Sequence, residues 1–243
     1  MLKNYSPWLH QLNRTRPVTT LDHDHETDVA IIGGGIAGIC TAYYALKNTD
    51  KQITLVEANK VAHGATGHNG GFLASYFERS FSSLIQEFGL KMAAEGQQAM
   101  ESAWTLLDEI REEAQLQTPM WQFTGYAACA NIEEVLVHLR NNALRLKAGL
   151  LSMPLMISEE AEQLSDIPDM YKELYTIKPK QEILSLLETE DEEYMAILPE
   201  RKGCMNSAVF CEELLSYMLN KYPDRLTLSE HTPVRRLVLK DKY

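Results

Sequence analysis

The chain has 243 residues, of which 45% are hydrophobic and 23% are charged, and its formal net charge is −11. This composition is that of an ordinary globular protein, and the length allows one large domain or two small ones. The acidic balance argues against a nucleic-acid binder, because no basic excess is present to neutralise phosphates, and against attachment to anionic lipid. We therefore expect no nucleic-acid partner.

The four cysteines, Cys40, Cys129, Cys204 and Cys211, form no CxxC pair and lack the spacing of zinc ligands. We interpret them as reduced thiols of a cytoplasmic protein and predict no metal site. Residues 29–46 form an uncharged stretch of 18 residues, near the lower limit for a membrane span. The stretch contains four glycines and begins with β-branched residues, so we expect a strand, a tight turn and a buried helix, and no membrane span.

Residues 1–26 are expected to form an irregular arm, because they contain Pro7, Pro17 and a polar run at 22–26. That run alternates acids and histidines, so metal binding is one interpretation of it. A solvated lead-in to the first strand is the preferred one.

Regular structure is predicted to begin with one βαβ unit. Residues 28–32 (DVAII) read as a buried strand that is apolar on both faces, as parallel strands tend to be. A turn at 33–38 leads into a helix at 36–47, and residues 52–57 (QITLVE) form the next strand. The crossover between the two strands should be right-handed.

Beyond this unit the pattern alternates between helix and strand. Helices are predicted at 80–117, 132–148, 157–164 and 207–222, the third from a helix-start signal at Ser158. A strand or hairpin arm is predicted at 120–130, a turn at Pro223, and strands at 226–230 and 234–239. Residues 166–203 are acidic and interrupted by prolines, and we expect an exposed turn there, centred on 188–193. The apolar residues of the first of these helices suit one buried stripe: Leu84, Phe88, Met92, Trp104, Leu107 and Ile110.

The turn at 33–38 carries the pattern GxGxxG, which is weak alone but here follows an apolar strand and opens a helix. In that context Gly33 permits the tight turn, Gly35 lets a pyrophosphate approach the backbone, and Gly38 lets the helix pack closely on the strand. The N–H groups at the start of the helix, including those of Ile36 and Ala37, then face the phosphates.

An acid is expected at the end of the next strand, about 20 residues on, and Glu57 stands there, followed by Ala58. Its carboxylate can accept hydrogen bonds from both ribose hydroxyls of an adenosine and repels a 2′-phosphate, which disfavours NADP. A glycine-rich turn without a ligand is the competing interpretation. The fingerprint leaves FAD and NAD open, although a second glycine cluster at 64–71 fits a longer cofactor.

The segments DVAIIGGG at 28–35 and GATGHNGG at 64–71 resemble the D-amino-acid oxidase superfamily of FAD-dependent oxidoreductases, which includes glycine and sarcosine oxidases. Together with Ser6-Pro7-Trp8, they are most similar to its gamma-glutamylputrescine oxidoreductase branch. His68 stands where that branch has Arg, and it is either a plain loop histidine or a point of covalent flavin attachment. The resemblance implies FAD as the cofactor, held near the pyrophosphate, the flavin ring and the adenine by Ala65, Thr66, Asn69, Gly70, Gly71 and Val234.

The fold expected from these features is α/β: a Rossmann-like FAD-binding domain interleaved with a smaller α+β substrate domain. The arm would span 1–26, the first part of the FAD-binding domain 27–75, the helical substrate domain 76–202, and the second, incomplete part of the FAD-binding domain 203–243.

The resemblance implies an enzyme that oxidises a C–N bond of an amine or amino acid by hydride transfer to flavin, with a small-molecule substrate. No residue is assigned as the catalytic base. The alternatives are a non-catalytic nucleotide-binding fragment or subunit that needs a partner, and an NAD-linked dehydrogenase. Members of the family are longer, so we expect a C-terminally truncated chain, inactive by itself, that lacks a C-terminal half or a partner subunit.

Overall fold

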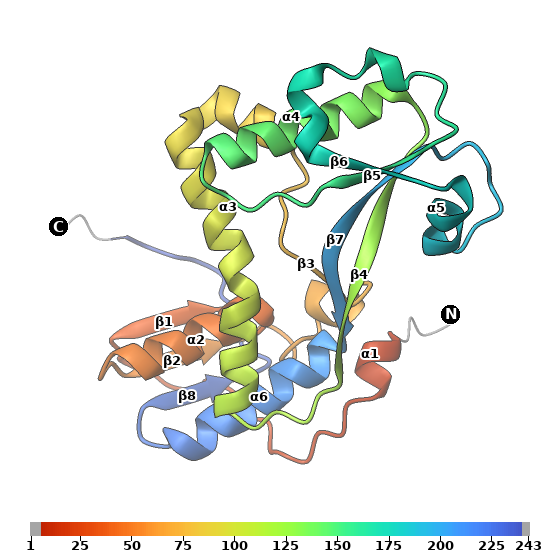
Figure 1. Ribbon diagram of the computed structural model, residues 1–243. Coiled ribbons are helices and arrows are strands. Elements are labelled where there is room, and N and C mark those ends of the chain that lie inside the picture. Colours follow the sequence, from red (N-terminus) through yellow and green to blue (C-terminus); the bar gives the residue numbers. More distant parts are fainter. Residues whose placement is uncertain (1–5, 240–243) are drawn as a thin grey trace. The chain divides into compact units, whose positions relative to one another are not determined.

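The computed structural model describes residues 6–239, which form two compact units (Figure 1). Unit 1 consists of the described parts of Met1–Phe72, Asp108–Trp121 and Cys204–Tyr243. Unit 2 consists of Leu73–Leu107 and Gln122–Gly203. The chain therefore passes from one unit to the other more than once. Both units combine helices with strands, so the predicted α/β fold class is confirmed.

Unit 1 is built on a small parallel sheet with the strand order β1-β2-β8 (Figure 1). Its strands are β1 (Val29–Ile32), β2 (Ile53–Val56) and β8 (Leu226–Ser229). Val29 lies opposite Ile53, and Ile53 lies opposite Leu226. Helix α2 (Ile36–Asn48) connects β1 to β2, so the predicted strand–helix–strand unit is confirmed.

Helix α2 contacts α6 (Ser207–Lys221), which leads into β8. The side chain of Asn206 caps α6 by accepting hydrogen bonds from two backbone N–H groups of its first turn. Tyr43 of α2 and Phe210 of α6 are among the largest fully buried side chains. Full burial of an apolar side chain of the size of phenylalanine contributes about 1.5–3 kcal/mol, which stabilises the pair of helices α2 and α6.

The expectation that residues 28–32 are buried on both faces is wrong. Ile31 is buried, whereas Ile32, on the opposite face of β1, is 56% exposed. The strand lies at the edge of the sheet, where the Ile31 side chain lies close to Gly38 of α2, whereas Ile32 stays exposed beside the buried Val56 of β2.

The predicted final strand at 234–239 is also wrong, because this stretch has no regular secondary structure. Its apolar side chains are exposed, with Val234 at 44% and Leu239 at 84%. Alternating apolar residues form a strand only where a neighbouring strand pairs with them and covers one face. Within residues 6–239, the sheet ends at β8.

Unit 2 carries the larger part of a second sheet, with the strand order β3-β7-β5-β6 and with β4 paired to β7. Strand β5 runs parallel to β6 and antiparallel to β7. A core cluster that includes Leu139, Leu155 and Ile157 lies between helix α4 (Ile132–Lys147) and this sheet. The strands are β3 (Phe72–Ala74), β4 (Met120–Cys129), β5 (Leu155–Ser158), β6 (Tyr175–Lys178) and β7 (Ala196–Met205).

The strand predicted at 120–130 and the helix predicted at 132–148 are confirmed by β4 and by α4 (Ile132–Lys147). The helix predicted at 157–164 is wrong, because Ile157 and Ser158 end strand β5 instead. The hydroxyl of Ser158 accepts a hydrogen bond from the N–H of Glu160, so the apparent helix-start signal closes a turn.

The acidic stretch at 166–203 is only partly an exposed turn. Residues 188–193 are a largely exposed connection, as predicted. The flanking residues fold into short 3₁₀ helices at Leu164–Asp166 and Asp169–Leu174, strand β6, helix α5 (Lys180–Leu187) and strand β7. Short apolar pairs such as Ile183-Leu184 are fully or almost fully buried here, and they are too brief to show a period in the sequence.

The predicted long helix is α3 (Phe81–Glu113), but it does not present one continuous apolar stripe. Gly89 has φ +78° and ψ 160°, which interrupts the helix and rotates the face of the residues that precede it. Phe88 and Met92, near this break, are 47% and 61% exposed, whereas Trp104 and Ile110 are buried. Among residues 6–239, no helix is both long and apolar enough to cross a bilayer.

Candidate cofactor site

The glycine turn between β1 and α2 depends on two of its glycines for steric reasons. Gly33 has φ +105°, a conformation that L side chains rarely adopt. A Cβ atom at Gly38 would lie 1.9 Å from the carbonyl oxygen of Gly33. The turn and the close approach of α2 to β1 therefore require glycine at both positions.

The N-terminus of α2 opens beside this turn and has the properties of an anion site. Gly35 is the N-cap residue, and no side chain caps the helix from that position. The N–H groups of Ala37 and Gly38 lie in the first turn, where they have no acceptor within the helix. These N–H groups and the positive end of the helix dipole favour a phosphate at this point.

Glu57 follows the last residue of β2 and is held against the glycine turn. One carboxylate oxygen accepts a hydrogen bond from Gly34 N at 2.7 Å, and the other accepts one from Asn59 N at 2.8 Å. A carboxylate offers about four lone-pair sites, so both oxygens can accept further hydrogen bonds. The acid thus stands at the carboxyl end of β2, beside the exposed Ala58.

The second glycine loop contacts the start of α2 directly. It includes a short 3₁₀ helix, Ala65–His68, and the hydroxyl of Thr66 accepts a hydrogen bond from Ile36 N at 3.0 Å. A Cβ atom at Gly35 would lie 3.0 Å from the same hydroxyl oxygen. The two glycine-rich segments, 30 residues apart, therefore border one site.

Asn69 organises the remainder of that loop. The side-chain nitrogen Nδ2 donates hydrogen bonds to Thr66 O and to Ser207 Oγ, both at 2.9 Å. The side-chain oxygen Oδ1 accepts one from Gly71 N at 2.8 Å. The Ser207 hydroxyl also donates to Thr66 O at 2.5 Å. Ser207 lies 138 residues beyond Asn69 in the chain, and no motif in the sequence points to it.

Val234 lies on the segment that leaves the sheet next to Glu57. The N–H of Thr232 donates to Glu57 O at 2.9 Å, and the N–H of His231 donates to Asn59 O at 2.8 Å. The structure therefore brings the start of this segment to the end of β2, two residues before Val234.

His68 is exposed at the end of the 3₁₀ helix, where its ring nitrogen Nδ1 lies 2.9 Å from Gly64 O. This contact within the loop accounts for its position. In the acidic and histidine-rich run of the arm, His23 is paired to the neighbouring Asp22, and His25 is hydrogen-bonded to Thr54 of β2. In the part of the chain that the structure describes, no group of three or more potential metal ligands is clustered.

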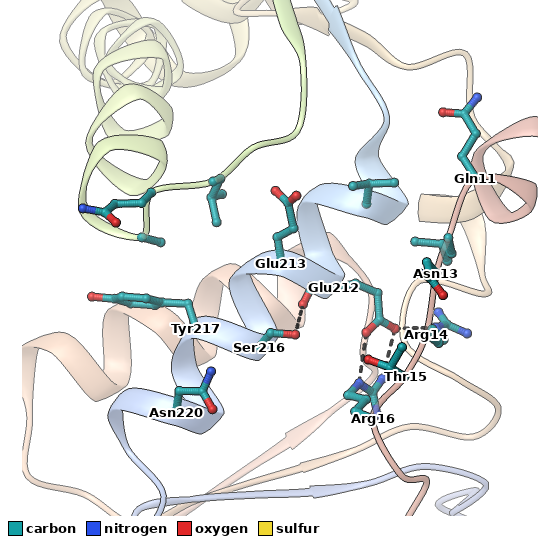
Figure 2. Close-up of a pocket in the computed structure, with 15 residues that line it drawn as sticks. Gln11, Asn13, Arg14, Thr15, Arg16, Glu212, Glu213, Ser216, Tyr217 and Asn220 are labelled. Carbon is teal, nitrogen blue, oxygen red and sulfur yellow. Dashed lines mark hydrogen bonds and ion pairs between the residues drawn. The ribbon is translucent and has the colours of Figure 1, made fainter.

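A separate cavity of about 530 Å³ in unit 1 does not contain the predicted cofactor residues (Figure 2). The arm lines one side of it and α6 another. Figure 2 shows Arg14 and Arg16 directed at Glu212, and both form ion pairs with that carboxylate. The neighbouring Glu213 accepts from the backbone and hydroxyl of Thr118. Since these charges already have partners, the cavity is a less suitable anion site than the start of α2.

The geometry of the first site fits a dinucleotide cofactor. The turn and helix start offer backbone N–H groups to a pyrophosphate, Glu57 offers acceptors to a ribose, and the second loop extends the site beyond the first nucleotide. An L side chain at Gly33 or Gly38 is sterically disfavoured, so the cradle depends on residues that the fingerprint requires.

Comparison with known proteins supports this interpretation. Residues 28–177 match the family model described as DAO, FAD dependent oxidoreductase. The chain is 34% identical over 111 residues to YhfW of Bacillus subtilis (strain 168), which is named as a Rieske 2Fe-2S iron–sulfur protein; the match covers 46% of this chain and 22% of YhfW. It is 30% identical over 81 residues to the gamma-glutamylputrescine oxidoreductase of Escherichia coli (strain K12), covering 33% of this chain and 19% of that protein.

The fold is similar to that of glycine oxidase from Geobacillus kaustophilus, with a TM-score of 0.57 and 18% sequence identity over 86% of this chain and 47% of that one. The chain thus spans less than half the length of each of these three proteins. The family model covers more than half of the chain, and it contains both glycine loops, Glu57 and much of unit 2. The chain belongs to the DAO family of FAD-dependent oxidoreductases.

Proposed function

We propose that this chain binds FAD between its two glycine loops and forms part of an oxidoreductase that oxidises a C–N bond of an amine or amino acid. The observation that carries the proposal is the hydrogen bond from Ile36 N to the hydroxyl of Thr66. This bond joins the second loop to the helix start that the first loop opens, and Glu57 lies beside the first loop.

Each part of the cofactor would have a distinct set of contacts in this arrangement. The backbone from Gly35 to Gly38, together with Ala65 and Thr66, would hold the pyrophosphate. Glu57 and Ala58 would hold the adenosine ribose, and the backbone of Val234 would contact the adenine. The peptide groups of Asn69, Gly70 and Gly71 would lie along the flavin ring.

The FAD-binding domain would then comprise residues 27–75 and 203–243, with 76–202 forming a substrate domain. When bound, FAD supplies the acceptor for a hydride from the carbon next to the substrate nitrogen. The substrate nitrogen would lose a proton to solvent as the imine forms, and water would hydrolyse the imine. The protein would contribute orientation and electrostatic stabilisation.

The choice of substrate class is supported by the names of similar proteins. One is a gamma-glutamylputrescine oxidoreductase and another is a glycine oxidase, and both names denote nitrogen compounds. We place the protein in the cytoplasm because its four cysteines show neither paired nor metal-binding spacing.

Anaerobic reduction of the flavin tests the reaction. The FAD-loaded protein would be mixed with glycine, sarcosine, proline and gamma-glutamylputrescine, and the visible flavin absorbance would be recorded. Bleaching by at least one amine, and none by 2-hydroxy acids of similar size, is the expected result. Bound flavin that no amine reduces would favour a nucleotide-binding subunit that needs a partner, an alternative supported by the chain spanning less than half of its relatives.

A further inference from the structure

The N-terminal arm of unit 1 contacts the second glycine loop directly. The hydroxyl of Ser6 donates a hydrogen bond to Gly67 O, and the indole N–H of Trp8 donates one to Asn69 O at 2.6 Å. Both residues belong to the start of the short helix α1 (Pro7–His10), where the Ser6 hydroxyl also accepts from Trp8 N at 3.2 Å. The arm therefore binds two carbonyl groups of the loop through side chains that it orients itself.

Two glycines of that loop lie where the arm packs against it. A Cβ atom at Gly67 would lie 2.3 Å from Ala62 O and 2.6 Å from a methyl carbon of Leu9. One at Gly71 would lie 2.7 Å from the ring of Trp8 and 2.8 Å from Met205 O. The glycine cluster at 64–71 and the family resemblance imply a close approach of this backbone to a cofactor. Both positions also leave room for the arm, beside backbone carbonyls of Ala62 and Met205.

Further along, the arm is anchored by a buried ionic cluster. Arg16 donates to both oxygens of Glu230, at 2.6 and 2.9 Å, and the side chain of Glu230 is fully buried. Glu230 also accepts from Val61 N at 2.7 Å, so the cluster reaches the segment that leads into the loop. Arg14 adds a hydrogen bond to Val61 O and an ion pair with Glu212, and the ion pair is drawn in Figure 2.

The cluster is in a charged form that favours this anchoring. Although burial alone raises the pKa of Glu230, its hydrogen bonds from Arg16 and Val61 N lower the pKa below the ordinary value. The arm is thus fixed at one end by Arg14 and Arg16 and at the other by Ser6 and Trp8. Helix α1, which contains Trp8 and is capped by Ser6, contacts the 3₁₀ helix of the loop and α6.

We propose that the arm is a clamp that positions the second glycine loop for FAD, and that Trp8 is the positioning residue closest to the flavin. This inference rests on the proposed cofactor site. By holding Asn69 O and packing against Gly71, Trp8 fixes the peptide groups that would lie along the flavin ring. Because coupling between two binding events is reciprocal, a clamp that favours FAD must itself be stabilised when FAD binds.

The substitution Trp8→Phe tests this role, since it removes the indole N–H and keeps an aromatic ring beside Gly71. Trp121→Phe is the matched control, because Trp121 is 63% exposed. FAD affinity would be measured by titration, and the environment of the flavin by its visible circular dichroism. We expect Trp8→Phe to weaken FAD binding about fivefold, as the loss of one hydrogen bond predicts, and to change the dichroism spectrum. Trp121→Phe should change neither.

Limited trypsin digestion supplies a readout that does not depend on activity. Cleavage after Arg14, followed by mass spectrometry, should be slower with FAD than without it in the unaltered chain, and the protection should be smaller in Trp8→Phe. Equal affinity and equal dichroism for the two tryptophan variants, or cleavage after Arg14 that ignores FAD, would overturn the clamp while leaving the cofactor site intact. Failure of the unaltered chain to take up FAD would overturn both.

Discussion

Gly38 shows how one residue determines whether the cofactor site forms. Its α-carbon lies so close to the preceding turn that an added methyl group would overlap the carbonyl of Gly33. Gly96 offers a contrast, because it lies within α3 and a Cβ atom there would be 3.8 Å from Phe77, an ordinary contact. Substitution by alanine should therefore change the free energy of unfolding in opposite directions at these two glycines.

Gly38→Ala is expected to destabilise the protein by about 1–3 kcal/mol, because α2 must move away from β1 to relieve the overlap. FAD binding should weaken as well, since the helix start would move with it. Gly96→Ala is expected to stabilise by about 0.4–1 kcal/mol through the lower entropy of the unfolded chain. Urea unfolding and FAD titration of both variants check this. Equal stability of the two variants would show that the close approach at Gly38 is not tight in solution.

Individual residues of the site differ in how far the sequence reveals them. The glycines at 33, 35 and 38 and the acid at 57 belong to a local pattern whose spacing is fixed by one strand, one turn and one helix. Ser207 and Trp8 act through contacts that span 138 and 61 residues of sequence. Such contacts depend on the assembled fold. The resemblance includes Trp8 in Ser6-Pro7-Trp8, but it gives the side chain no role, and nothing local marks Ser207.

Elements of unit 1 are joined by a second ionic cluster, centred on Glu113 at the end of α3. Its carboxylate accepts from Lys47 of α2 at 2.6 Å and from Lys221 and Tyr217 of α6, both at 3.0 Å. The hydrogen bond from Lys47, then that from Lys221, lowers the pKa of Glu113 to about 2. The cluster therefore ties the end of α3 to both helices.

This lowered pKa predicts a pH dependence of stability. A carboxyl group with a lower pKa in the folded state stabilises the fold above its unfolded pKa, near 4.5, and loses that contribution as the pH falls towards about 2. Glu113→Gln should lower stability by about 1 kcal/mol near neutral pH and reduce the slope of stability against pH between about 4.5 and 2. Glu112→Gln, at the exposed neighbouring position, should change neither.

Acid-unfolding curves followed by circular dichroism would measure this difference. Parallel curves for Glu113→Gln and the unaltered chain across the acid range would contradict the assignment of the cluster.

Whole elements could be predicted where their periodicity is long and uninterrupted. Helices α2, α4 and α6 have nearly the predicted bounds for that reason. At the end of β5 the sequence predicts a helix instead, because a serine followed by acidic residues is also typical of a helix N-terminus. The strands and the helix between 166 and 203 are not predicted from the sequence, because each apolar run there is too short to show a period. The break at Gly89 could not be foreseen, since a glycine within a helical pattern is usually tolerated.

At the scale of the whole molecule, the sequence predicted the family and the α/β class because both glycine loops lie in one short stretch. It did not predict the exposed face of β1 or the irregular segment at 234–239. An apolar segment forms a strand only when a neighbouring strand pairs with it, and a face of a strand is buried only when another element packs on it. Both conditions depend on the complete sheet. The chain spans less than half the length of the similar proteins, so its assembly into an active oxidoreductase is part of the proposal.

FAD titration of the unaltered chain and of Glu57→Gln tests whether the glycine turn and Glu57 form the cofactor site. Glutamine can still accept the hydrogen bond from Gly34 N, but it has no charge and only one acceptor oxygen. Glu190→Gln, at an exposed position of the 188–193 connection, is the matched control. We expect a yellow complex for the unaltered chain and the control, and FAD binding weaker by about 10- to 100-fold for Glu57→Gln. An unaltered chain that takes up no FAD, or a Glu57→Gln variant that binds FAD as tightly as the control, would contradict this expectation.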